Sequence, residues 1–218
     1  MKILILGATG RTGRLIVEEA LKQGYDLHVL VRDESKISFG SKSIKVYQGT
    51  PARQTDLAIA MQGCDLVISA LGIVRASDAP WSKLITAKNF ISESIKNVIA
   101  EADQQNLKRL ITVSAWGVGE TQKEIPFWLR WLINHTNLGP VYAEHEAEEK
   151  LLANSNLNWT AVRPVALNEC KKIKTLKVSL NNFPKPSLQI SRQSVAKFIV
   201  DIVKSDKYDM KSPTISEN

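Results

Sequence analysis

The sequence predicts an α/β fold, in which a doubly wound parallel sheet has helices on both faces and a small appendage follows at the C-terminal end. Three observations support this class. Short apolar runs alternate with segments whose apolar residues recur at helical spacing. Two of the runs, residues 3–6 and 66–69, lack polar alternation, as strands covered by helices on both faces do. The 218 residues, 44% of them hydrophobic, suit one domain with a sizeable core.

The elements follow one another in a regular order. A strand at residues 2–6 leads through a glycine-rich turn into a helix that ends at Gly24, and a strand at 27–31 completes a βαβ unit. The pattern predicts further strands at 44–48, 66–70, 109–113 and 159–163, and helices at 56–61, 83–104, 126–133 and 142–154. This alternation favours parallel pairing with right-handed crossovers.

The pattern changes after residues 163–164. Residues 171–190 alternate lysine with apolar residues and then contain Pro184 and Pro186, which favours a hairpin or an irregular flap over a helix. Ser191 is typical of an N-cap, and a helix is expected from there to about residue 204. We interpret residues 1–218 as a single domain, with a core at 1–162 and a C-terminal part at 163–218 on the substrate side.

Composition and charge limit the classes of partner. The net charge is +7, but residues 1–162 hold 18 basic and 17 acidic side chains, whereas residues 163–218 hold 11 and 5. The basic excess is therefore local, and no nucleic-acid recognition motif accompanies it. Apolar runs are too short to span a bilayer, and Cys64 and Cys170 show neither a disulfide framework nor metal-ligand spacing. We expect a cytoplasmic protein with no metal, nucleic acid or membrane as partner.

The most informative segment is Gly7-Ala8-Thr9-Gly10-Arg11-Thr12-Gly13, which lies between the first strand and the first helix. Glycine permits positive φ in a tight turn and a close approach of the backbone to phosphate groups. The free N–H groups and the dipole of the following helix attract an anion. The spacing is GxxGxxG, a variant of the dinucleotide signature, and it predicts a Rossmann-like fold that binds a dinucleotide.

The end of the second strand indicates which dinucleotide. Arg32 occupies the position at which a carboxylate contacts the ribose in NAD sites and an arginine meets the 2′-phosphate in NADP sites. Lys36 is close behind, and Arg11 in the glycine turn is expected to reach the same phosphate. We therefore predict NADP, with NADPH preferred over NADH. Asp33, one position after Arg32, argues in the other direction.

These residues resemble a known family: the atypical short-chain dehydrogenases with NmrA-like domains, and within them the NADPH-dependent biliverdin-IXβ/flavin reductases. The similarity covers nearly the whole chain. It runs through the glycine turn, Val29-Leu30-Val31-Arg32-Asp33, Asp65-Leu66-Val67-Ile68, Leu71-Gly72, Val113-Ser114-Ala115, His145 with residues 151–157, Arg163-Pro164, Ile190-Ser191 and Lys207-Tyr208.

The resemblance implies roles for further residues. Ala70, Leu71 and Gly72 would line the cofactor, Ser114 would lie near the nicotinamide, and Arg163, Pro164 and Val165 would close the site. It implies that His145 faces the substrate pocket, and Ser114 and His145 are therefore the candidate catalytic residues. The alternatives are that His145 lies on a helix surface beside Glu144, Glu146 and Glu148, and that Ser114 only ends a strand.

Two departures from the family pattern affect function. Where the family has Gly-Asp-Val after the third strand, often at the adenine, this chain has Gly49-Thr50-Pro51. Typical short-chain dehydrogenases use Tyr-x-x-x-Lys, in which the lysine lowers the tyrosine pKa for proton exchange. The residues four positions beyond the four tyrosines are Val29, Pro51, Glu146 and Ser212, so no such pair exists.

A conjugated acceptor takes hydride without a strong general acid, so the sequence favours an NADPH-dependent reductase of a flavin, a quinone or a linear tetrapyrrole. The basic C-terminal part would suit an anionic acceptor. Trp116, residues 127–131 and the flap would cover the acceptor, although Trp128 and Trp131 also fit a helix that docks its apolar stripe on the core. The alternative function is a non-catalytic NADP-binding, redox-sensing regulator. A monomer or a weak homodimer is expected.

Overall fold

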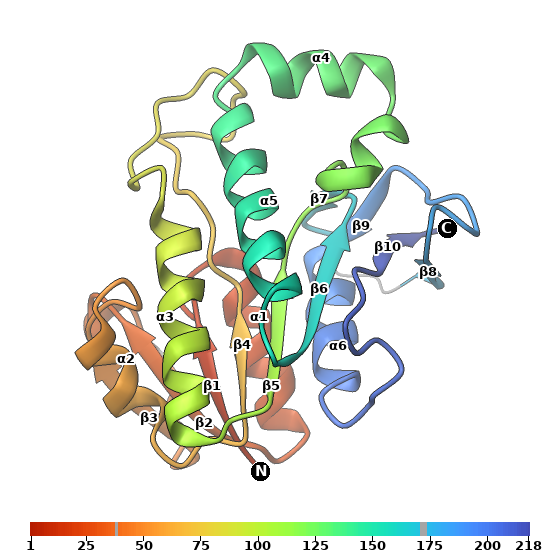
Figure 1. Ribbon diagram of the computed structural model, residues 1–218. Helices are drawn as coiled ribbons and strands as arrows, with labels where there is room; N and C mark the ends of the chain where they lie inside the picture. Colours follow the sequence, from red (N-terminus) through yellow and green to blue (C-terminus); the bar gives the residue numbers. More distant parts are fainter. Residues whose placement is uncertain (38, 171–173) are drawn as a thin grey trace.

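A computed structural model describes residues 1–37, 39–170 and 174–218 (Figure 1). Its main sheet has eight strands in the order β3-β2-β1-β4-β5-β6-β10-β8. All neighbours pair in parallel except β8, which is antiparallel to β10. The predicted α/β class is confirmed. The strands are β1 (Lys2–Leu6), β2 (Asp26–Val31), β3 (Ile44–Gln48), β4 (Leu66–Ser69), β5 (Arg109–Val113), β6 (Asn158–Pro164), β8 (Leu176–Ser179) and β10 (Thr214–Glu217).

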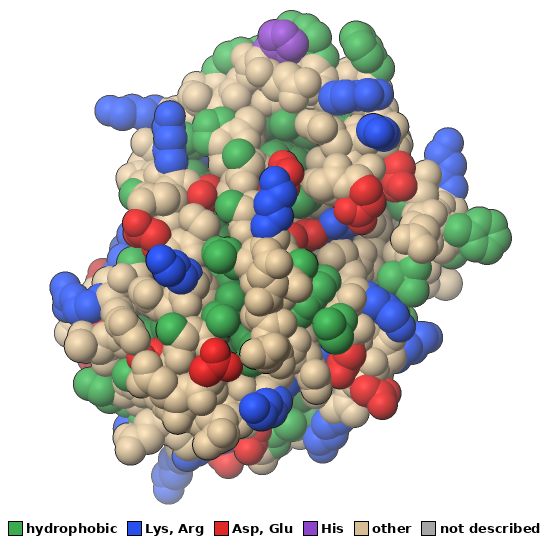
Figure 2. Space-filling view, in the orientation of Figure 1, with side chains coloured by type: hydrophobic (Ala, Val, Ile, Leu, Met, Phe, Trp, Pro, Cys, Tyr) green, Lys and Arg blue, Asp and Glu red, His purple; other side chains and the backbone are tan. Residues whose placement is uncertain are grey.

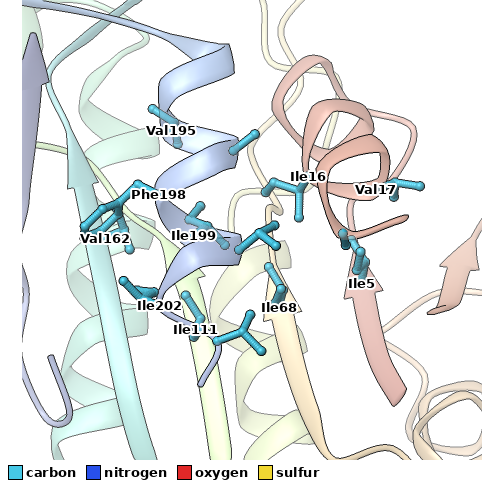
Figure 3. Close-up of a cluster of buried hydrophobic side chains, with 14 of the residues drawn as sticks. Ile5, Ile16, Val17, Ile68, Ile111, Val162, Val195, Phe198, Ile199 and Ile202 are labelled. Atoms are coloured by element: carbon cyan, nitrogen blue, oxygen red, sulfur yellow. The ribbon is translucent and has the colours of Figure 1, made fainter. Parts of the chain in front are cut away.

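Helices cover both faces of this sheet because alternate side chains of each strand point in opposite directions. Ile3 and Ile5 belong to one buried cluster, with α1 (Arg11–Lys22) and α6 (Arg192–Asp201), and Figure 3 shows its side chains meeting between these helices and the sheet. Leu4 and Leu6 belong to the other, with α2 (Gln54–Met61), α3 (Phe90–Gln105) and α5 (Gly139–Ala153). The dinucleotide turn is therefore anchored on a strand whose side chains are all packed.

The predicted helix at residues 83–104 is too long at its start, because α3 begins at Phe90. Residues 74–86 instead form a hairpin-like excursion, in which the Ile85 amide donates to the Val74 carbonyl at 2.8 Å. The N-terminus of α3 is capped from another helix. The Glu144 carboxylate of α5 accepts hydrogen bonds from the Ile91 and Ser92 amides at 3.0 Å each. A tertiary contact thus decides where this helix begins.

The C-terminal quarter completes the sheet through β10 and β8, and α6 packs against α1. Two short strands, β7 (Ala166–Asn168) and β9 (Gln189–Ser191), pair in parallel beside it. The Ser191 N-cap is confirmed, because its hydroxyl accepts the Ser194 amide at 3.1 Å. The predicted flap contributes β8 and a turn bridged at Leu180 and Phe183, and its first residues, 171–173, lie outside the described part.

Three shorter helices lie at or beyond the carboxyl ends of the strands. They are η1 (Glu34–Lys36) after β2, and η2 (Gly119–Lys123) and α4 (Phe127–His135) after β5. No helix within the described residues is long and apolar enough to cross a membrane.

Candidate functional site at the carboxyl ends of the strands

The glycine turn is built so tightly that side chains would not fit in it. Gly7 has φ +80°, and a β-carbon there would lie 2.5 Å from the Ala70 carbonyl oxygen. A β-carbon on Gly13 would lie 2.0 Å from the Gly7 carbonyl oxygen. The Gly10 amide closes the turn by donating to that same carbonyl at 2.9 Å. The turn, the end of β4 and the start of α1 are therefore in backbone contact.

The N-terminus of α1 is open to an anion. Gly10 is its N-cap, no side chain caps it, and its first turn contains no acidic residue. Its first N–H groups consequently lack intrahelical partners. The chain builds the sheet outward in opposite directions from β1 and from β4. It leaves β1 on the face covered by α1, and it leaves β4 on the face covered by α3. Dinucleotides bind in such a crevice, and the residues present fit one.

A cavity of about 620 Å³ lies where β2 and β3 end, and Arg32 lines it as the sequence predicts. The sequence did not predict the second guanidinium group of this cavity. Arg53 also lines the cavity, as the N-cap residue of α2, and no side chain caps that helix. Apolar walls come from Ile85 and Phe90, and Thr50 of the atypical segment 49–51 completes the rim. The cavity combines two guanidinium groups, one carboxylate, Asp56, which lies 3.3 Å from Arg53, and apolar walls, an environment that can bind a phosphorylated nucleoside.

Asp33, the residue that argues for NAD, caps its own turn in this structure. Its carboxylate accepts the Ser35 amide at 3.1 Å and the Ser35 hydroxyl at 2.6 Å, which caps η1. These hydrogen bonds, together with nearby Lys36, lower the pKa of Asp33. Lys36 lies 3.7 Å from this carboxylate and is not among the residues that line the cavity. The sequence argument against NADP thus concerns a carboxylate that is engaged elsewhere.

Arg11 differs from its expected role beside Arg32. Its guanidinium forms two hydrogen bonds with Asp78, at 2.7 and 2.9 Å, and lies 3.5 Å from Glu169. The hydrogen bonds with Asp78 raise the pKa of Arg11 and lower that of Asp78. Arg14, one turn later, reaches the backbone oxygen of Lys36 at 3.4 Å. Since Asp78 follows β4 and Arg11 follows β1, their ion pair bridges the two walls of the crevice.

Ser114 follows β5, and its hydroxyl donates to Glu149 of α5 at 2.5 Å. Glu149 also accepts from Arg163 Nε at 3.0 Å, and Arg163 forms a second ion pair with Glu120. Burial lowers the Arg163 pKa, but its hydrogen bonds with Glu149 and Glu120 outweigh burial and raise it. The hydrogen bond from Arg163 lowers the Glu120 pKa. Ser114 is thus one end of a continuous charged network.

His145 is buried, so the alternative of a helix-surface histidine is wrong. Its Nδ1 lies 2.9 Å from the Glu148 carboxylate, which is 1% exposed. Burial raises the pKa of Glu148, and the hydrogen bond with His145 works against that shift. On strand β4, the buried hydroxyl of Ser69 has no hydrogen-bond partner among the residues that the structure describes. The two candidate catalytic side chains therefore bond to neighbouring glutamates rather than to each other.

The alternative that Trp128 and Trp131 dock on the core is wrong. Trp116 is buried, but Trp128 and Trp131 are 60% and 47% exposed, so these two do not dock on the core. Ile133 is the buried residue of α4. Burial raises the pKa of Tyr142, which lies at the start of α5.

A separate cavity of about 540 Å³ lies between α5, β6 and β10, and Figure 2 shows acidic and basic side chains gathered on this face. Glu149 and Arg163 line it, so the network that holds Ser114 also faces this cavity. Three further predicted residues, Ala70, Pro164 and Val165, have these neighbours. Ala70 adjoins the glycine turn, the Pro164 carbonyl accepts the Trp116 amide at 3.0 Å, and Val165 is buried beside β10.

Glu149 and Arg53 are the site residues that sequence reasoning missed. Glu149 stands four positions after His145, which places both on one side of a helix, and this spacing was the available signal. Arg53 stands four positions after Gly49 at the start of a predicted helix, but nothing local indicates that it shares a cavity with Arg32. Asp78 had no local signal at all.

Comparisons with known proteins agree with this geometry. A family model described as NAD(P)H-binding matches residues 7–206. The photosystem II assembly factor Ycf39 of Synechocystis is 26% identical over 75% of this chain, which spans only 44% of that protein. A UPF0659 protein of Saccharomyces cerevisiae is 24% identical, with 92% of this chain and 86% of that protein covered.

Solved structures show the same fold. A short-chain dehydrogenase/reductase of Veillonella parvula in complex with NADP superposes with a TM-score of 0.81 and 19% identity, covering 99% of this chain and 94% of that one. The anaerobilin reductase ChuY of Escherichia coli superposes with a TM-score of 0.81 and 19% identity, covering 100% and 97%. The fold is that of NAD(P)-binding reductases.

Proposed function

Because the chain belongs to the NAD(P)H-binding family, we propose that it is an NADPH-dependent reductase that transfers hydride to a conjugated acceptor, such as a flavin, a quinone or a linear tetrapyrrole. One observation carries the cofactor part of this proposal. The uncapped N-terminus of α1 and the cavity lined by Arg32 and Arg53 both lie at the carboxyl ends of the parallel strands. Together they suit a pyrophosphate and a 2′-phosphate.

The residues present would hold the dinucleotide as follows. The amides that follow Gly7 and those at the start of α1 bind the pyrophosphate, and Thr9 and Thr12 lie in the same turn. Arg32 binds the 2′-phosphate, and the segment from Ala70 to Gly72 supports the nicotinamide half. The bound nicotinamide supplies the hydride. The protein's part is to place the acceptor against it and to exclude water.

The engagement of the polar side chains supports the proposed acceptor class. The Ser114 hydroxyl directs its proton to Glu149 at 2.5 Å, which leaves its oxygen free only to accept a hydrogen bond. Burial raises the pKa of Tyr142, which makes that phenol a weaker acid. A carbonyl that needs a strong proton donor is therefore disfavoured, whereas a conjugated system that delocalises the added charge is suited to the site.

Purified protein tests this proposal directly. NADPH oxidation should be accelerated by at least one of FMN, riboflavin, biliverdin or a simple quinone, and Arg32→Ala should weaken NADPH binding far more than NADH binding. Lys42→Ala is a matched control, because Lys42 lies near the opposite end of the sheet. Equal effects of Arg32→Ala on both cofactors would refute the 2′-phosphate assignment. A steeper salt dependence of kcat/KM for anionic than for neutral acceptors would support an anionic substrate.

A second candidate function is a redox sensor that holds NADP without turning it over. It is favoured by the engagement of both candidate catalytic side chains, Ser114 with Glu149 and His145 with Glu148, at 2.5 and 2.9 Å. The two proposals differ in one result. A sensor binds NADPH, but no acceptor of the panel accelerates its oxidation.

A further inference from the structure

Four large aromatic side chains are exposed to solvent near the carboxyl ends of the strands. Phe127, Trp128 and Trp131 of α4 are 77%, 60% and 47% exposed, and Trp81 of the preceding hairpin is 64% exposed. We call these four residues the aromatic rim. Figure 1 shows α4 and the loop that contains Trp81 at the same end of the molecule. Residues 127–131 are also the predicted cover of the acceptor, whereas Trp81 has no role assigned to it, and exposed aromatic clusters of this kind mark interaction sites.

The hairpin holds Trp81 in a defined position. Its two arms are joined by the Ala76 amide, which donates to the Lys83 carbonyl at 2.9 Å. Its tip is tied to the segment between α4 and α5, because the Asn137 side chain donates to the Trp81 and Ser82 carbonyls at 3.0 and 3.1 Å. The two parts of the aromatic rim are therefore coupled by hydrogen bonds, and Trp81 projects from a supported loop.

Helix α4 is oriented with its largest apolar side chains exposed to solvent. The helix buries Ile133 and leaves Trp128 and Trp131 outside, although a helix that only stabilises a core buries its largest apolar side chains. Trp131 stacks on His135 with ring centroids 4.9 Å apart, which holds one more ring on the outer surface. Tryptophan has an apolar body and a polar N–H, the combination that favours the boundary between lipid and water.

The two segments that carry the aromatic rim are predominantly basic. Residues 74–88 and 127–137 carry four basic side chains, Arg75, Lys83, Lys88 and Arg130, and one acidic side chain, Asp78. That single acid is already paired with Arg11 at 2.7 Å. The rim is thus a set of aromatic side chains within a basic surface, which complements an anionic surface and repels a second copy of itself.

We propose that the aromatic rim docks this protein on the interface of an anionic membrane, with its tryptophans among the headgroups and its lysines facing anionic lipid. This contact is peripheral, since aromatic side chains enter the interface while the backbone stays outside it. The expectation that no membrane is a partner rested on the absence of a spanning segment, which does not bear on an interface of this kind. The proposal does not depend on the proposed reductase activity.

Binding to vesicles tests the proposal without any cofactor. The full chain is mixed with vesicles of phosphatidylcholine alone or of phosphatidylcholine with phosphatidylglycerol, and binding is followed by sedimentation. We expect binding to the anionic vesicles that weakens with salt, and quenching of tryptophan fluorescence by brominated lipid. Trp128→Ser with Trp131→Ser should lower the partition coefficient at least tenfold on these vesicles.

Charge and control variants complete the experiment. Lys83→Glu with Lys88→Glu should lower binding to anionic vesicles about tenfold or more, because each basic residue near such a surface contributes about 1 kcal/mol. Phe183→Ser removes an aromatic side chain that is 83% exposed on a different loop, and it should leave binding unchanged. Lys42→Glu with Lys45→Glu makes the same charge change near the opposite end of the sheet and should weaken binding less.

Three outcomes would overturn the proposal. The first is that the wild-type chain does not bind anionic vesicles. The second is that Phe183→Ser weakens binding as much as the paired tryptophan substitution does. The third is a dimer in sedimentation equilibrium that the tryptophan substitutions dissociate while no vesicle binding is seen, which would assign the rim to contact between copies of the chain. Unchanged thermal unfolding of each variant ensures that a lost fold is not mistaken for lost binding.

Discussion

Glu149 is the position at which a single substitution should destabilise this protein most clearly. Its carboxylate accepts hydrogen bonds from Ser114 at 2.5 Å, from Arg163 at 2.5 and 3.0 Å, and from Ser212 at 3.3 Å. The side chains of Arg163 and Glu149 are only 4% and 10% exposed. Glu149→Ala would therefore leave a buried guanidinium with Glu120 as its remaining ion-pair partner.

The expected magnitude follows from this burial. Removing one partner of a buried ion pair costs about 3–5 kcal/mol when the other charge is left unpaired, and because Glu120 still pairs with Arg163 we expect a loss at the lower end of that range. Glu120→Ala is the matched control, since it removes the other ion pair of the same Arg163. Glu120 is 67% exposed, so water can replace its carboxylate, and we expect a loss of about 1 kcal/mol or less.

Urea unfolding at neutral pH, followed by tryptophan fluorescence, measures both free energies of unfolding. Combining Glu149→Ala with Arg163→Met removes the stranded charge and should recover part of the lost stability. If Glu149→Ala destabilises the protein no more than Glu120→Ala does, the buried pair does not have the energetic role that its burial indicates.

Three further predictions concern the crevice and α5. Gly13→Ala should abolish NADPH binding or unfold the protein, because its β-carbon would lie 2.0 Å from a backbone oxygen. Gly10→Ala should be milder, because its β-carbon would lie 3.2 Å from that oxygen. Equal effects of the two variants in thermal unfolding and NADPH titration would contradict this. Burial raises the folded-state pKa of Glu148. The contribution of Glu148 to the free energy of unfolding is therefore lost as pH rises above about 4.3, the ordinary glutamate value. Glu148→Gln should gain stability relative to wild type between acidic and neutral pH. A pH-independent difference in urea unfolding would show that reasoning to be wrong. Asp78→Asn should strengthen NADPH binding severalfold, because it frees Arg11 and removes a negative charge from the crevice. Weaker binding in a fluorescence titration would indicate instead that the ion pair supports the site.

Matched controls exist for these three predictions. Gly40→Ala places a β-carbon with nothing within 4 Å. Glu146→Gln changes an exposed carboxylate on the same helix as Glu148. Asp33→Asn removes a carboxylate that caps its own turn and should have a smaller effect on NADPH binding than Asp78→Asn.

The dinucleotide turn and the strands that support it were predictable because their determinants are local. Gly7 needs a positive φ, and Gly10 and Gly13 follow at fixed spacing before a helix, so three nearby residues specify the turn. The apolar run of β1 packs on both faces, and its residues reveal this without knowledge of their partners. The α/β class and the position of the glycine turn between β1 and α1 follow from these short-range patterns alone.

The rest was decided by contacts between residues far apart in the chain. Glu149 meets Ser114 across 35 positions, and Arg11 meets Asp78 across 67, so no local pattern can indicate either pair. The start of α3 depends on a carboxylate from α5. Helix α4 is apolar on several sides, so its periodicity does not say which side is buried, and only packing turned Trp128 outward. Sequence determined the cofactor-binding framework because turns and strands are specified locally. The tertiary structure decided how the charged network and the aromatic rim are arranged, because ion pairs and helix faces depend on distant partners.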